Sequence, residues 1–127
     1  MARIVGVGGV FFMSQDRDAL NGWYHDVLGL EIEDWGGVFF RPGPMAEQPG
    51  AGTVFTAFAA DSTYFAPSTR EFMINLAVDD LDGILARCAE HGVEVLLRFD
   101  GENGRFAHIV DLDGTKIELW QPLAPPD

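Results

Sequence analysis

Apolar residues recur at helical spacing in two separate stretches of the chain. The first stretch places them at three- and four-residue intervals, at Leu20, Trp23, Tyr24, Val27 and Leu28. The second repeats the spacing at Leu81, Ile84, Leu85, Cys88 and Ala89. An aspartate that can cap a helix precedes each stretch, and a glycine suited to a left-handed cap follows each. The pattern predicts one amphipathic helix in each half of the chain.

Apolar and β-branched runs surround these two stretches and predict strands. In the first half the runs are residues 4–13, 30–35, 38–41 and 53–59, and in the second half 72–78, 93–99, 106–110 and 115–120. Gly36-Gly37 and Asp113-Gly114 supply hairpin turns, and residues 42–52 and 60–70 are predicted loops. The predicted order is therefore βαβββ, followed by βαβββ.

The landmarks of the two halves keep a nearly constant separation. The two capping aspartates, Asp16 and Asp80, are 64 residues apart, and the dipeptides Gly52-Thr53 and Gly114-Thr115 are 62 residues apart. One supersecondary unit used twice explains this agreement. We expect an α+β fold in a single domain, residues 1–127, with one module over about 4–60 and a second over about 71–121.

Composition narrows the classes of partner. The chain has 127 residues and a formal net charge of −12, which argues against nucleic acids and anionic membranes and suits a cationic ligand, although acidity also keeps a protein soluble. Cys88 is the single cysteine, so no disulfide can form within the chain. No apolar run reaches the roughly 20 residues of a membrane span, and the N-terminus lacks signal-peptide features. These features predict a cytoplasmic location.

Candidate chemistry lies in the last predicted hairpin. Strand alternation places Glu118 beside Trp120 on the less apolar face of its strand, and His108 on one face with Phe106 and Val110. If both faces border one cavity, His108 is the natural proton shuttle near neutral pH, and Glu118 orients it or acts as a base. The alternatives are that Glu118 faces water and that His108 simply packs on aromatic rings.

Several segments resemble the vicinal oxygen chelate superfamily, which includes glyoxalase I, bleomycin-resistance proteins, fosfomycin-resistance enzymes and extradiol dioxygenases. The resemblance rests on the tandem βαβββ order and on residues 23–30 (WYHDVLGL), 78–82 (VDDLD) and 111–119 (DLDGTKIEL). Residues 72–75 (FMIN) and 103–106 (NGRF) are similar to one subgroup of glyoxalase or bleomycin-resistance proteins. The resemblance implies two modules whose sheets curl into a cleft, usually in a homodimer. It does not fix the reaction.

The resemblance also implies where a metal would bind. Metal-dependent relatives place one ligand on the first and one on the last strand of each module, and the matching positions here are Gly9, Thr56, Met73 and Glu118. Only Glu118 is a strong ligand, whereas hard divalent cations need several carboxylate or imidazole donors. We therefore predict no metal and no other cofactor. The alternative is a metal held by His108 and Glu118 with water molecules.

The same strand positions predict the lining of the cleft. Residues that alternate with these positions should point into the cleft, and the family resemblance implies that His108 does so as well. The predicted ligand-binding residues are Phe11, Thr56, Phe58, Met73, Asn75, His108 and Trp120. Trp35, together with Tyr64 or Phe65, would form a lid from the loops. The alternative is that the side chains of the cleft fill it as an ordinary core.

Three hypotheses about function follow. The first is a metal-independent protein that binds a small or cationic aromatic ligand, similar to the bleomycin-resistance branch. The second is a glyoxalase-type lyase or isomerase, or a dioxygenase-like enzyme, with His108 and Glu118 as catalytic residues. The third is an association domain whose sheet edges and Trp120 are buried against a partner. The first is the preferred interpretation, with a small molecule as ligand and a homodimer as the assembly.

Overall fold

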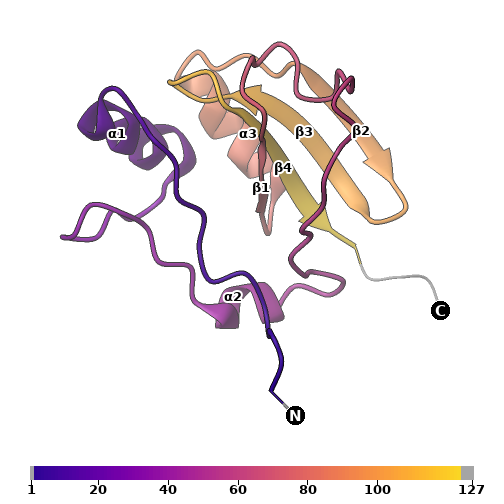
Figure 1. Ribbon diagram of the computed structural model, residues 1–127. Coiled ribbons are helices and arrows are strands. Elements are labelled where there is room, and N and C mark those ends of the chain that lie inside the picture. The colour runs from indigo at the N-terminus through magenta and orange to yellow at the C-terminus, as the bar shows by residue number, and fades with distance from the viewer. Residues whose placement is uncertain (1, 124–127) are drawn as a thin grey trace.

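A computed structural model describes residues 2–123, so Met1 and residues 124–127, the two ends of the predicted domain, lie outside it. Its elements are α1 (Arg17–Leu28), α2 (Pro42–Ala46), β1 (Ile74–Ala77), α3 (Leu81–Glu90), β2 (Leu97–Gly101), β3 (Gly104–Val110) and β4 (Lys116–Pro122) (Figure 1). The four strands form one mixed sheet in the order β1-β4-β3-β2, in which β1 is parallel to β4 and the other pairs are antiparallel. The predicted α+β class is confirmed.

The two predicted helices form with the predicted ends. Asp16 accepts a hydrogen bond from the backbone N–H of Ala19 at 3.1 Å, and Gly29 ends α1 with φ of 73°. In α3, Asp80 accepts from the backbone N–H of Gly83 at the same distance of 3.1 Å. Both caps satisfy backbone donors that the first turn of a helix leaves free. These helix ends are therefore set by local sequence.

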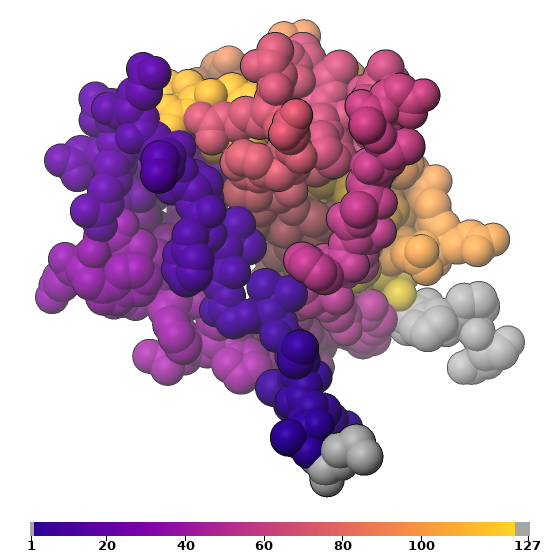
Figure 2. Space-filling view, viewed as in Figure 1, coloured from indigo at the N-terminus to yellow at the C-terminus, as the bar shows by residue number. Residues whose placement is uncertain are grey.

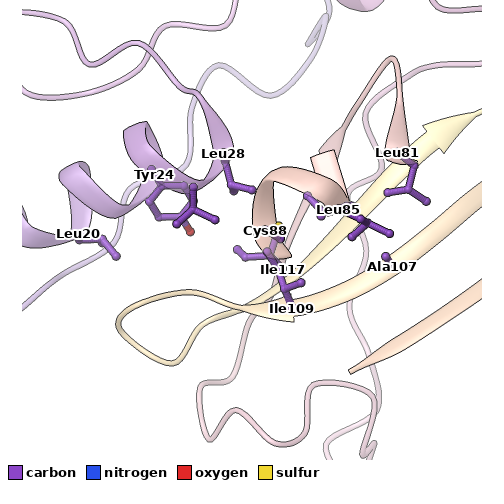
Figure 3. Close-up of a cluster of buried hydrophobic side chains, with 11 residues drawn as sticks. Leu20, Tyr24, Leu28, Leu81, Leu85, Cys88, Ala107, Ile109 and Ile117 are labelled. Carbon is purple, nitrogen blue, oxygen red and sulfur yellow. The ribbon is translucent and has the colours of Figure 1, made fainter. Parts of the chain in front are cut away.

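The core lies between the helices and one face of the sheet (Figure 3). The apolar stripe of α3 contributes Leu81 and Cys88, which are fully buried, and the stripe of α1 contributes Leu20. The sheet contributes Ile109 from β3 and Ile117 from β4 to the same core. Each of the leucine and isoleucine side chains contributes about 1.5–3 kcal/mol through its removal from water. The opposite face of the sheet carries polar side chains, among them Glu118.

The first-half strands are the main correction to the sequence analysis. Within residues 2–123, the predicted strands 4–13, 30–35, 38–41 and 53–59 are not paired into a sheet. Figure 2 shows the N-terminal segment, in indigo, lying along the surface. Ile4 and Phe11 are 95% and 94% exposed, and Phe55 is 90% exposed. A strand needs the hydrogen-bonding groups of a neighbouring backbone, and an apolar pattern alone does not supply them.

Smaller corrections concern element boundaries. The predicted loop over residues 42–52 begins with the short helix α2, where Pro42 occupies the first turn and its missing N–H costs nothing. The strand predicted at 93–99 is displaced: β2 runs over Leu97–Gly101. The Gly36 turn does form, with the backbone N–H of Glu33 donating to the carbonyl of Gly37 at 2.8 Å. Among the described residues, no helix is long and apolar enough to cross a membrane.

Candidate functional site

Three polar side chains lie in one row across the sheet. The strand register pairs Asn75 on β1 with Glu118 on β4, and Glu118 with His108 on β3. Paired residues project to the same side of a sheet, so the three side chains share a face. Ile117 and Leu119 of β4 point to the opposite side, into the core. The structure thus brings His108 and Glu118 together, the arrangement suggested by strand parity combined with the family resemblance.

The Glu118 carboxylate is the centre of a hydrogen-bond network. Its Oε2 contacts His108 Nε2 at 2.7 Å and accepts a second hydrogen bond from the hydroxyl of Tyr64. Its Oε1 accepts from Asn75 Nδ2 at 2.8 Å. The Glu118 side chain is 13% exposed, so these bonds form in a site largely withdrawn from water. Three donors therefore converge on one carboxylate.

The network favours the ionised form of Glu118. Burial alone would raise the pKa of this carboxyl, but the hydrogen bonds from His108, Tyr64 and Asn75 favour the charged form and lower the pKa overall. The pKa of Tyr64 is raised by burial and by its bond to Glu118, so the phenol keeps its proton and acts as a donor. The site therefore presents a fixed negative charge at neutral pH.

His108 lies beneath the network and is fully buried. Its Nε2 faces both Glu118 and the Tyr64 hydroxyl, the latter at 3.2 Å. Its Nδ1 is buried and has no hydrogen-bond partner among the described residues. A hydrogen on Nε2 supplies the donor that Glu118 needs, whereas a hydrogen on Nδ1 would lack an acceptor. The geometry thus assigns His108 the role of a donor that holds Glu118.

Lys116 ties the loop that carries Tyr64 to the sheet. Its side chain is buried, and Nζ donates to the backbone carbonyls of Tyr64 at 2.6 Å and Ala66 at 2.9 Å. Burial lowers the pKa of this ammonium, and the nearby Glu118 opposes that shift. The two hydrogen bonds place the Tyr64 hydroxyl above Glu118. The sequence did not indicate that Lys116 holds this loop, because residues 60–70 have no periodic pattern that reveals their contacts.

A row of aromatic rings flanks the polar row. Trp120, Phe106 and Phe99 are neighbours across β4, β3 and β2. Phe99 and Phe106 are stacked with centroids 4.9 Å apart, and Phe106 and Trp120 are nearly parallel at 6.4 Å. On the loop side, Tyr64 stacks on Phe58 at 5.3 Å. The carboxylate therefore lies among the faces and edges of aromatic rings.

Members of both rows border a cleft of about 780 Å³. Five of the predicted ligand-binding residues line it: Thr56, Phe58, Met73, Asn75 and Trp120. Glu118 lines it too, and so do the predicted lid residues Tyr64 and Phe65. The other two predicted ligand-binding residues, Phe11 and His108, are not in the lining, and neither is Trp35. Phe11 lies on the exposed N-terminal segment, and His108 lies under Tyr64.

The side chains at this cleft do not suit a hard divalent cation. Of the positions implied by the family resemblance, Thr56 and Met73 offer weak donors and Gly9 offers none. His108 directs Nε2 at Glu118, so the two are engaged with each other. Across residues 2–123, no group of three or more His, Cys, Asp or Glu side chains gathers around one point. The absence of a metal stays a prediction.

Comparison with known proteins identifies the fold. No family model matches the chain, and no curated protein matches it either. Among solved structures, it is similar to TnmS3, an antibiotic binding protein from Streptomyces sp. CB03234, with 20% identity over 97% of this chain and 100% of that chain and a TM-score of 0.59.

Two further structures agree over nearly the whole chain. A glyoxylase/bleomycin resistance protein/dioxygenase domain from Frankia sp. EAN1pec has 18% identity, covers 95% of this chain and 100% of that chain, and has a TM-score of 0.61. FosX, a fosfomycin resistance protein from Listeria monocytogenes, has 12% identity, covers 95% of this chain and 96% of that chain, and has a TM-score of 0.58. The chain therefore has the glyoxalase/bleomycin-resistance/dioxygenase fold of the vicinal oxygen chelate superfamily.

Proposed function

We propose that the protein binds a small cationic aromatic molecule in the cleft and does not convert it chemically. The observation that carries this proposal is the ionised Glu118, held by three donors at the base of a cleft with aromatic walls. A negative charge and ring faces both attract a cation, the rings through their quadrupoles. The net charge of −12 draws cations toward the protein from a distance.

The same residues support binding more than catalysis. A general base works best when its pKa lies near the working pH, and the network lowers the pKa of Glu118 instead. His108 is fully buried and does not border the cleft. The buried ammonium of Lys116 does not border it either, because it is turned to two backbone carbonyls. Similarity to an antibiotic binding protein is in keeping with a small-molecule ligand.

The test uses a cation and a neutral molecule of the same shape, benzyltrimethylammonium and neopentylbenzene, in calorimetric titrations. We expect the cation to bind at least about tenfold more tightly, which corresponds to about 1.4 kcal/mol. Glu118→Gln should remove this preference. Glu71→Gln is the matched control, because Glu71 is an exposed carboxylate in the same lining. Equal binding of the two molecules, or an equal effect of both substitutions, would refute the proposal.

The direct contact between His108 and Glu118 favours a second function, a glyoxalase-type lyase or isomerase. In that case the pair moves a proton, and both His108→Ala and Glu118→Gln abolish turnover of a glutathione hemithioacetal while the protein stays folded. Full activity in both variants would eliminate this mechanism. Turnover by the unsubstituted protein would count against a purely binding function.

We also propose that a second copy of the chain covers the exposed strands of the first half. Residues 4–13 and 53–59 carry apolar side chains and unpaired backbone groups, a combination that an identical chain can satisfy by pairing. Light scattering after size exclusion should give the mass of a dimer. Phe55→Asp should shift it to a monomer, because a charge would be buried in the contact. A monomer at all concentrations would overturn this assembly.

A further inference from the structure

We infer that the cleft selects a quaternary or otherwise donor-poor cation over a primary ammonium of the same size. This inference deepens the proposed function and rests on it. It follows from counting the hydrogen-bond acceptors that Glu118 has left. The ligand class it names is an aromatic molecule with a trialkylammonium, an N-alkylpyridinium or a similar cationic group.

The Glu118 carboxylate is nearly saturated by the protein itself. A carboxylate offers about four lone-pair directions, two on each oxygen. Oε2 uses two, for His108 Nε2 and for the Tyr64 hydroxyl. Oε1 uses one, for Asn75 Nδ2. About one direction is then left for a ligand.

A primary ammonium needs more acceptors than this. Its three N–H groups are all bonded to water in solution, and only one of them finds a place on Glu118. Phe58, Phe106 and Trp120 also border the cleft with aromatic rings, and the second carboxylate of the lining, Glu71, is exposed. Each donor left unpaired in such surroundings costs binding energy. A quaternary cation has no N–H to satisfy, and it gains from both the carboxylate charge and the ring faces.

Asn75 controls the remaining edge of the carboxylate. Its hydrogen bond to Oε1 lies at the exposed end of the network, whereas the bonds from His108 and Tyr64 are partly buried. The Asn75 amide nitrogen donates to Oε1, so this oxygen has one acceptor position fewer for a ligand in the cleft. Asn75 is thus the residue expected to decide between the two kinds of cation.

The experiment compares benzyltrimethylammonium with benzylammonium, both cationic at pH 7, in calorimetric titrations. We expect the quaternary cation to bind about tenfold more tightly to the unsubstituted protein. Asn75→Ala frees one acceptor on Glu118, so the ratio of the two affinities should fall toward one. Asn103→Ala is the matched control: Asn103 lines the same cleft, its side chain makes no hydrogen bond to Glu118, and the ratio should not change.

The outcomes separate this inference from the proposed function. If both cations exceed neopentylbenzene but benzylammonium binds equally or better, the proposed function stands and the selectivity is wrong. If neither cation exceeds the neutral molecule, the proposed function fails as well. If both asparagine substitutions lower the ratio equally, the acceptor count is not its cause. Circular dichroism confirms that each variant is folded.

Discussion

The two halves of the chain contain the same pattern but only one completes a sheet. Phe55 and Ile117 occupy corresponding positions, each two residues after a Gly-Thr pair. Ile117 lies on β4 and is fully buried, whereas Phe55 is 90% exposed and is not part of a strand. The difference between them lies in their neighbours, because β4 has a backbone on each side and the segment around Phe55 has none.

The helices of the two halves show no such difference. Asp16 and Asp80 make the same capping hydrogen bond, at 3.1 Å in both cases. The glycines that follow the helices, Gly29 and Gly92, both have positive φ, 73° and 69°. Helix hydrogen bonds join residues four apart, so a helix is complete within its own segment. A strand instead takes its hydrogen bonds from a distant segment, so the same local pattern can form a helix in both halves and a sheet in only one.

The largest expected effect tests this comparison directly. In dilute, monomeric protein, Ile117→Ala should reduce the free energy of unfolding by about 2–5 kcal/mol, because it leaves a cavity in the core. Phe55→Ala should change it by less than about 0.5 kcal/mol, because the ring is in water. Urea unfolding measures both values. A large loss of unfolding free energy for Phe55→Ala in the monomer would contradict the exposure of the first half. A loss seen only at high protein concentration would instead indicate that a second copy of the chain covers Phe55.

The next effect concerns Glu118 and its counterpart in the first half, Thr56. Glu118→Gln should lower the free energy of unfolding by about 1–3 kcal/mol at pH 7, because it weakens hydrogen bonds to a charged group. The network lowers the folded-state pKa of Glu118, so its stabilisation is present above the unfolded pKa of about 4.3 and disappears as the pH falls through the folded pKa.

Urea unfolding between pH 7 and pH 3 measures this dependence. The difference between the unsubstituted protein and Glu118→Gln should shrink on acidification. Thr56→Ala should have little effect at any pH, because Thr56 is exposed and its hydroxyl bonds only to the neighbouring carbonyl of Ala57. A difference for Glu118→Gln that stays constant down to pH 3 would show that the carboxylate charge contributes nothing.

The smallest effect is expected at the helix caps. Asp16→Ala and Asp80→Ala should each reduce the free energy of unfolding by about 1 kcal/mol, the usual value for a lost N-terminal cap. The two losses should be similar, since the caps have the same geometry in both halves. Thermal unfolding of the two variants side by side gives the measurement. A much smaller loss for Asp16→Ala would mean that α1 contributes less to the folded state than α3.

The sequence alone determined the local structure of this protein. The apolar spacing of α1 and α3, their capping aspartates and the alternation along β4 all depend on residues within a few positions of one another. Alternation gave the face of His108 and of Glu118 within each strand, and the register of β3 against β4 placed the two on one side of the sheet. Most of the predicted cleft lining was found by counting alternate residues from the positions that the family resemblance marked as inward.

Only the tertiary structure decided how these residues are connected. Tyr64 reaches Glu118 from a loop without periodicity, and Lys116 holds that loop through backbone carbonyls that carry no sequence signal. The structure also left the first-half strands unpaired, which their composition did not reveal. A hydrogen bond between distant segments depends on where the whole chain brings them together, whereas a helix or an alternating strand face depends on spacing alone.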